Sequence, residues 1–276
     1  MDFKAIVLDI NELPPLSDIA RIVNKLYEEG SCNVNILQLV KAIESDAALS
    51  ANILHMINAP YYGFSKKIAS ISQAVTLFGT DLIYGLVQNY AIRLNIKANM
   101  RPYGLTNEKF NEICHLQSAL MTQWYSKIDL RHAQFLASLA LIMETGKLVV
   151  AREVVKDGKI KEFTQGIKEC EDITLYEHSL FASSSYYISG LLFEHWNMEP
   201  LYVDILKGLD YEHEKSNSQQ MNAYINSLDV VRTAVNVKEI FTKESLTKSV
   251  ELLEDMNFRV DDFLLVVKRV KKRYEQ

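Results

Sequence analysis

The helical character of this chain is plainest in residues 46–63, which read DAALSANILHMINAPYYG. Asp46 can accept a hydrogen bond from a free backbone N–H group at a helix start. The apolar side chains that follow, Leu49, Ile53 and Met56, recur at the spacing of one helix face. Pro60 cannot continue a helix, so it ends the pattern. The stretch predicts one amphipathic helix followed by a turn.

Similar patterns flank this helix on both sides. Ser17 can cap a helix that Gly30 ends, and Asn35 begins the next one. Residues 70–73, SISQ, form a capping box that opens a short helix ending at Gly79, and a longer helix starts at Thr80 or Asp81. The longer helix is expected to carry Leu82, Leu86, Tyr90 and Leu94 on one face.

The pattern continues to the end of the chain, and no alternating strand pattern competes with it. Residues 98–105, with Pro102 and Gly104, are the expected boundary, and residues 210–219 read as an exposed polar loop. Further helices are predicted after a cap at Asp129, from a capping box at Thr174–Glu177, from Ser183–Ser185, and near 219–236, 245–257 and 261–274. The predicted fold class is all-α, with a subdomain over 1–100, a second over 101–210 and a C-terminal extension over 211–276 that packs on the rest.

Composition limits the classes of protein to consider. The formal net charge is −5, which argues mildly against binding to nucleic acid phosphates. The N-terminus lacks a signal pattern, and the apolar run Phe135–Met143 is too short to span a membrane, so we expect a cytoplasmic protein. The three cysteines, Cys32, Cys114 and Cys170, are widely spaced and are expected to be reduced thiols.

Several common kinds of chemistry lack their motifs. The sequence has no G-x-G-x-x-G or Walker-type glycine loop, no H-E-x-x-H and no G-x-S-x-G. The six histidines are scattered, and none is followed by Asp. His195 beside Trp196 reads as a packed or surface residue, and His213 reads as a solvated loop residue.

A series of short motifs resembles a known family. In order along the chain these are Leu13-Pro14-Pro15-Leu16, Asp46–Ser50, Asn58–Gly63, Ile68–Ile71, Ala74-Val75 and Leu77-Phe78-Gly79. Together they resemble the HDOD domain, the HD-related output domain of bacterial signalling proteins. The similarity extends over roughly residues 13 to 210 and implies an HD-like orthogonal helix bundle with an N-terminal helical subdomain.

The resemblance also points to a lost metal site. Residues 141–148, LIMETGKL, resemble the segment where HD phosphohydrolases carry a His-Asp pair, and here Met143 and Glu144 stand in those places. A thioether cannot replace imidazole on a hard, water-activating metal. Ser185 stands where relatives often have His, Leu209–Tyr211 falls near a family His pair, and His115 is a candidate remnant of an upstream ligand. We therefore expect no metal, no cofactor and no catalytic residue.

The family implies a regulatory role, in motility, chemotaxis or gene regulation, through a signalling partner or a small ligand. The candidate interaction surface is the turn bearing Asn58, Tyr61, Tyr62 and Phe64, unless these rings pack inward and seal the junction between the two halves. The surplus of apolar helix faces makes a homodimer reasonable.

Two alternatives stay open. One is a residual metal-dependent phosphohydrolase, or a cleft that still binds a nucleotide. The other is a nucleic-acid-binding regulator that uses a basic cluster on the last helix, which otherwise reads as a solvated helix face. The cluster comprises Lys268, Arg269, Lys271, Lys272 and Arg273, and it is expected to lie opposite Phe263, Leu264, Val267 and Val270.

Overall fold

Side-chain caps determine where many of the helices begin. In the computed structural model, which describes residues 2–30, 33–212 and 218–276, Asp46 accepts a hydrogen bond from the Leu49 backbone at 2.9 Å. Ser17, Asn35 and Asp129 cap the helices predicted for them in the same way. Cys32, His213 and part of the predicted loop at 210–219 lie outside the described residues.

The chain is all-helical, as predicted. Apart from an isolated antiparallel bridge between Val235 and Ile240, the described residues form no β-structure. The α-helices are α1 Phe3–Asn11, α2 Asp18–Tyr27, α3 Ile36–Glu44, α4 Ala47–Ile57, α5 Ile71–Asn95, α6 Asn107–Tyr125, α7 Leu130–Ile142, α8 Gly146–Lys156, α9 Ile160–Glu169, α10 Ile173–Phe181, α11 Ser185–His195, α12 Pro200–Gly208, α13 Gln219–Ala234, α14 Lys243–Asp255 and α15 Val260–Tyr274. The 3-10 turns η2 Pro60–Tyr62 and η3 Arg101–Tyr103 join them.

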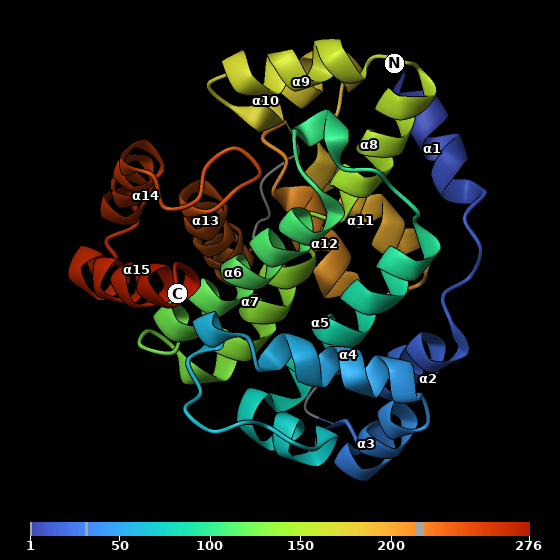
Figure 1. Cartoon of the computed structure of the whole chain (residues 1–276), viewed down its shortest axis with the longest axis vertical. Coiled ribbons are helices and arrows are strands. Elements are labelled where there is room, and N and C mark those ends of the chain that lie inside the picture. Colours follow the sequence, from blue (N-terminus) through green and yellow to red (C-terminus); the bar gives the residue numbers. More distant parts are fainter. Residues whose placement is uncertain (1, 31–32, 213–217) are drawn as a thin grey trace.

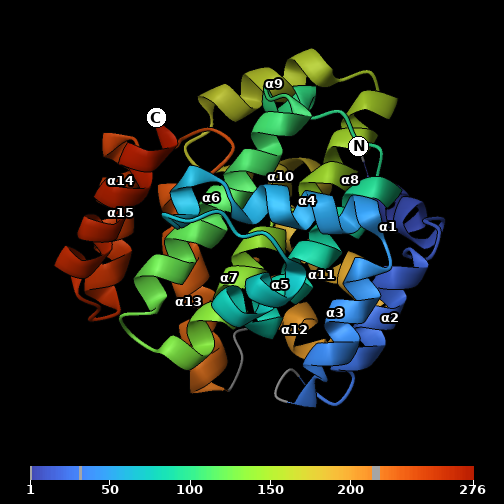
Figure 2. The same cartoon turned by 60° about the horizontal axis from the view of Figure 1, so that its bottom comes forward.

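Helix α7 lies in the centre of the molecule, where it packs on α5 and on α6 (Figure 1). On one side α2, α3 and α4 cover α5, and on another α8, α11 and α12 pack together. Helices α13 and α15 contact α6, with α14 outside them, and Figure 2 shows α14 and α15 as a red layer at one edge. Helix α1 packs on α8 and α11, so residues 3–11 lie with the second half of the chain.

The break predicted at Gly79 is present. Its backbone has φ 74° and ψ 171°, so α5 consists of two helical segments that meet at a kink. A β-carbon there would collide with the Gln134 side chain of α7, at 1.6 Å from its Oε1. Glycine thus allows both the positive φ and the close approach of α7.

Three sequence predictions about local structure were wrong. The capping box at Thr174 does not form, because Asp172 lies two residues earlier and already caps α10 by accepting from the Leu175 backbone. Leu94, expected on the same face as Leu82, is exposed because it lies where α5 ends. Leu264 is 38% exposed, and Val266 takes the buried place on α15 instead.

Helices α7 and α8 also contain the one stretch, among the described residues, that is long and apolar enough to cross a membrane. This stretch is Leu130–Lys156, and 94% of its apolar window is buried inside the fold. Core helices of soluble proteins behave in this way, because the same apolar side chains that could face lipid here face neighbouring helices.

Candidate functional site

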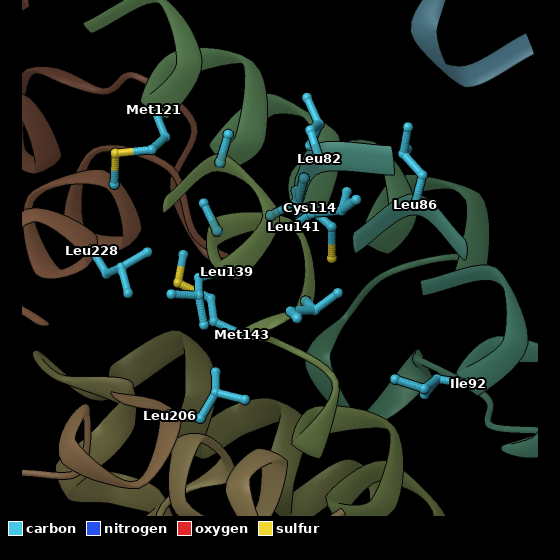
Figure 3. Close-up of a cluster of buried hydrophobic side chains, with 14 of the residues drawn as sticks. Leu82, Leu86, Ile92, Cys114, Met121, Leu139, Leu141, Met143, Leu206 and Leu228 are labelled. Carbon is cyan, nitrogen blue, oxygen red and sulfur yellow. The ribbon is translucent and has the colours of Figure 1, made fainter. Parts of the chain in front are cut away.

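Met143 lies at the junction of α7 and α8, where the HD resemblance placed a metal-binding histidine. Its side chain is fully buried, and Figure 3 shows it in an apolar cluster with Leu139, Leu206 and Leu228. Its carbonyl oxygen accepts a hydrogen bond from Ser189 Oγ at 2.8 Å. Met143 therefore acts as a core residue.

The next residue, Glu144, forms a buried ion pair with Lys147 one helical turn later. The distance from Lys147 Nζ to Glu144 Oε2 is 2.8 Å, and neither side chain is more than 1% exposed. The ammonium group also donates to Ser185 Oγ at 2.8 Å and lies 3.9 Å from Glu177 Oε1. Side chains from α8, α10, α11 and the α7–α8 junction thus converge on one cation.

Both carboxylates of this centre have further hydrogen-bond donors. Glu144 Oε1 accepts from Gln117 Nε2 at 2.8 Å and from the Tyr186 hydroxyl at 3.1 Å. Glu177 accepts from the Tyr103 hydroxyl and from the Ser185 backbone, each at 2.7 Å. The residues that hold this closed centre are Tyr103, Gln117, Glu144, Lys147, Glu177, Ser185 and Tyr186.

The ion pair and the hydrogen bonds of the closed centre keep both Glu144 and Lys147 in their charged forms. Burial alone would raise the pKa of Glu144, but the Lys147 ammonium and the Gln117 hydrogen bond hold it below its ordinary value. Burial alone would lower the pKa of Lys147, but the Glu144 and Glu177 carboxylates raise it above its ordinary value. The charged forms therefore stabilise each other.

Close packing of α8 on α11 brings these groups together. A β-carbon on Gly146 would lie 1.9 Å from the Ser185 carbonyl oxygen, so only glycine fits at this position. The Gly146 backbone N–H donates to Ser189 Oγ at 2.7 Å, which satisfies a free donor at the start of α8.

The residues at this centre do not fit the metal that the HD resemblance implies. Among the described residues no group of three His, Cys, Asp or Glu side chains lies close enough together to hold an ion. Glu144 already binds an internal cation, and an incoming metal would have to displace the Lys147 ammonium. Met143, in turn, offers only a thioether that is turned into the apolar core.

His115 does not join Glu144. It lies on α6 with Nδ1 3.2 Å from the Tyr62 hydroxyl, and its Nε2 has no hydrogen-bond partner in the described part of the chain. Burial, with Arg93 and His55 adding to it, lowers its pKa to about 3, so the ring is neutral at pH 7. Gln117, two residues further along α6, is the side chain that faces Glu144.

The turn after α4 is built largely from internal contacts. Asn58 Nδ2 donates to the Leu54 and Ile68 carbonyls, and its Oδ1 accepts from the Ile68 backbone at 2.8 Å. Tyr62 is 6% exposed and Tyr61 is half-buried, whereas Phe64 is 43% exposed. Of the predicted surface residues, Phe64 is the most exposed.

The basic cluster on α15 is divided between two roles. Arg273 lies against Gly63 of the turn and donates to Gln123 Oε1 at 3.3 Å, and Lys271 donates to the Phe241 carbonyl at 3.1 Å. The remaining basic residues, Lys268, Arg269 and Lys272, are exposed. Two of the five cationic side chains therefore fasten α15 to the rest of the molecule.

Asp210, near the family's downstream His pair, forms a separate buried cluster. Its carboxylate lies 2.8 Å from His178 Nε2 and accepts from the hydroxyl and backbone of Ser184. Burial alone would raise the pKa of Asp210, but the hydrogen bonds from Ser184, His178 and the Glu212 backbone lower it.

Sequence reasoning missed Lys147, Glu177 and Gln117 as members of one centre. Each is a polar residue on a helix face whose other residues are apolar. This pattern indicates a buried polar group that needs a partner, and it could have identified all three residues. Their partners are up to 118 residues apart along the chain, as in the bond from Gln117 to the Val235 carbonyl, so periodicity could not pair them.

Comparisons with known proteins agree on the fold. A family model described as the HDOD domain matches residues 13–210. An HDOD domain protein of unknown function from Geobacter sulfurreducens is similar in structure, with 18% identity, TM-score 0.69, and coverage of 99% of this chain and 94% of that chain. A protein from Shewanella amazonensis SB2B, provisionally named a phosphohydrolase, has 15% identity, TM-score 0.69, and coverage of 97% and 93%.

A protein from Marinobacter aquaeolei VT8, provisionally named a signal transduction protein, has 20% identity and TM-score 0.63. That match covers 95% of this chain and 61% of the other. No curated protein is significantly similar to the sequence. Since the structural matches cover nearly the whole chain, the C-terminal helices beyond residue 210 also belong to the shared fold.

Proposed function

This chain belongs to the HDOD domain family, and we propose that it is a non-catalytic regulatory module of bacterial signal transduction that acts in the cytoplasm by contacting a protein partner. One observation carries the proposal: the Lys147 ammonium lies between the carboxylates of Glu144 and Glu177, and Glu144 is the residue that stands where the resemblance expects the aspartate of an HD hydrolase. A centre whose cation is a side chain has no open coordination position for a water or a phosphate.

The proposal excludes hydrolysis by this chain, and a metal inventory tests that part. The purified protein is incubated with Mn²⁺, Fe²⁺ or Zn²⁺, desalted, and assayed for bound metal and for turnover of p-nitrophenyl phosphate. We expect substoichiometric metal and no turnover. Stoichiometric metal together with turnover that is lost in Glu144→Gln would overturn the proposal in favour of a phosphohydrolase.

The partner-binding surface that we propose lies beside the turn after α4. A groove there is lined by Phe64, Leu77, Phe78 and Val266, with Arg269 at its edge. Phe64 and Leu77 are 43% and 44% exposed, and the neighbouring face of α15 carries the exposed basic side chains. Apolar rings beside positive charge suit a protein segment with apolar anchors and acidic flanks.

Two surface variants test this part without disturbing the core. Phe64→Ser and Arg269→Glu should abolish the signalling phenotype that complementation of a gene deletion restores, while Leu94→Ser, which removes another exposed apolar side chain, should complement fully. Full complementation by both groove variants would rule out this surface.

Binding to nucleic acid through α15 stays an alternative. Because α15 packs on α6 and η2, deleting the last helix would disturb the fold, and replacing Lys268, Arg269 and Lys272 by Glu is the cleaner test. Salt-sensitive DNA or RNA binding that this triple variant loses would favour the alternative.

A further inference from the structure

Helix α1 lies across α8 and α11, and these two helices also pack on each other (Figure 1). The following helix, α2, packs on α3 and α5 instead, so the chain passes from one half of the molecule to the other between residues 12 and 17. We call the face of α8 and α11 that α1 covers the α1-binding surface.

The apolar part of this contact has the pattern of an amphipathic helix docked by one face. Ile6 and Ile10 are 0% and 3% exposed, and the Phe3 ring centroid lies 6.3 Å from that of Tyr187 on α11. Phe3, Ile6 and Ile10 stand at positions i, i+3 and i+7. Helical segments that bind in the grooves of other proteins present their anchors at this spacing.

The polar part of the contact is only partly matched. Asp9 Oδ1 accepts a hydrogen bond from Arg152 Nη2 of α8 at 3.1 Å, whereas Asp9 Oδ2 is buried and has no hydrogen-bond partner in the described structure. Cavities of about 290 and 340 Å³ border this pair, and Lys97 lines both. Lys97 makes no ion pair with any residue that the structure describes. Since an unsatisfied buried oxygen is costly, α1 does not match this surface fully.

Helix α1 depends on this contact for its structure. It has nine residues, fewer than the roughly 12–15 that an isolated helix needs in water, so an undocked α1 would unfold. The chain is fastened again directly after α1. His195 Nε2 lies 3.3 Å from the Leu13 carbonyl oxygen, and Trp196 Nε1 donates to the Pro14 carbonyl at 3.1 Å. A released segment would therefore end near residue 12 and leave the other helices in place.

We propose that the α1-binding surface is a docking site for an amphipathic helix of a partner protein, and that α1 is an internal occupant which this helix displaces. The partner helix has the pattern of α1, with large apolar residues at i, i+3 and i+7 and a carboxylate at i+6. Because α1 competes from within the same chain, the partner helix needs an additional contact. A second carboxylate that pairs with Lys97 supplies it.

This docking site is separate from the partner surface at Phe64, which lies on α5, α6 and α15. Docking of a helix is measured on the purified protein, whereas the Phe64 surface is tested by complementation. Failure of the docking test therefore leaves the proposed function standing, and failure of the complementation test leaves the α1-binding surface standing.

Binding of an α1 peptide to the full chain tests the proposal. The probe is a fluorescein-labelled peptide of residues 2–12, DFKAIVLDINE, followed by fluorescence anisotropy. Ile6→Asp/Ile10→Asp in the full chain expels α1, so the peptide should bind this double variant at least about tenfold more tightly than the wild type. Leu8→Asp changes the exposed side of α1 and should bind the peptide as the wild type does. Equal affinity for the double variant and the wild type would overturn the proposal.

A charge exchange tests whether the peptide docks in the orientation of α1. A peptide with Asp9→Lys should bind the double variant at least about tenfold more weakly than the native peptide, because it meets the Arg152 guanidinium with a like charge. Adding Arg152→Glu to the double variant should reverse the preference between the two peptides. An unreversed preference contradicts the docking geometry.

Hydrogen exchange on the wild-type chain gives a test that needs no variant. Amides of α1 should exchange at least about 100-fold faster than those of α7, since α1 opens without the core. Equal protection of α1 and α7 would make α1 a fixed part of the core and overturn the proposal. A wild-type dimer that becomes a monomer in the double variant would also overturn it, by assigning the surface to α1 of a second copy.

Discussion

The two polar regions on either side of Tyr186 differ in how their cations are paired. In the closed centre, Lys147 Nζ lies 4.3 Å from the ring centroid of Tyr186 and has two carboxylates and a hydroxyl around it. At a surface pocket of about 430 Å³ between α14, α13 and the start of α10, the Arg232 guanidinium lies 4.1 Å from the same centroid and is paired with one carboxylate, that of Asp229. The Tyr186 ring thus contacts two cations, one between two carboxylates in the core and one paired with a single carboxylate at a surface pocket.

This difference teaches which of the two cations is enclosed in the core and which one lies at a surface pocket. A buried charge whose partners are all internal has no free valence for a ligand. Removing any partner destabilises the fold, because the remaining charges stay buried without compensation. Substitutions in the two regions should therefore differ in their effect on the free energy of unfolding.

The largest effect is expected for Lys147→Met. The change leaves Glu144 and Glu177 buried without their shared cation, which should cost about 3–5 kcal/mol of the free energy of unfolding, measured by urea denaturation. Lys156→Met on the same helix removes a cation that is 66% exposed and should cost less than about 1 kcal/mol. Similar losses in the two variants would mean that the centre is not an effective ion pair.

A somewhat smaller effect is expected for Gly146→Ala. The added methyl group meets the backbone of Ser185, which cannot rotate away, so α8 and α11 must separate. We expect a loss of about 1–3 kcal/mol in thermal or chemical unfolding. Gly158→Ala is the control, since a β-carbon there meets nothing within 4 Å and pays only for its φ of +71°. A Gly146→Ala variant as stable as wild type would disprove the tight contact.

The neutral His115 ring predicts a stability that depends on pH. Its pKa is about 3 in the folded state against an ordinary value of 6.5, so the unfolded chain binds a proton that the folded chain does not. Stability therefore falls as the pH falls from about 6.5 towards 3, by up to about 1.4 kcal/mol per pH unit from this residue. His115→Gln should flatten the dependence in that window, as urea midpoints at several pH values would reveal. An unchanged slope would mean that His115 titrates alike in both states.

The smallest effect on stability is expected at the pocket rim. Glu251→Gln/Asp255→Asn changes exposed side chains and should alter the free energy of unfolding by less than about 0.5 kcal/mol. Measured by the same urea titration as Lys147→Met, this contrast tests the division into a structural centre and an open pocket. A loss of several kcal/mol in the rim variant would place the rim in the structural core.

Much of the fold could be predicted because its signals are local. Caps at Ser17, Asn35 and Asp129 act on backbone groups within three residues, and helix periodicity is a property of short windows. The errors have the same origin. Thr174 satisfies a capping pattern, but Asp172 competes for the same backbone donors and wins. Helices α1, α8, α9 and α12 were not predicted from the sequence.

Of the candidate site, the sequence predicted only which HD-type residues are replaced. The sequence identified Met143 and Glu144 as departures from the HD pattern, and Ser185 as another, but it placed His115 near them when Gln117 faces Glu144. An error of two residues on a helix turns a side chain by more than half a turn, so a small uncertainty in register selects a different face.

The sequence by itself determined the helical class, the family pattern and the absence of a His-Asp pair, since all of these are written in residues that are close together along the chain. Only the tertiary structure decided that the Lys147 ammonium fills the centre and that the Arg232 guanidinium stacks on Tyr186 beside it. The physical reason is that Glu177 and Tyr186 come from helices distant in sequence, and a buried charge finds its partner only when the helices have packed.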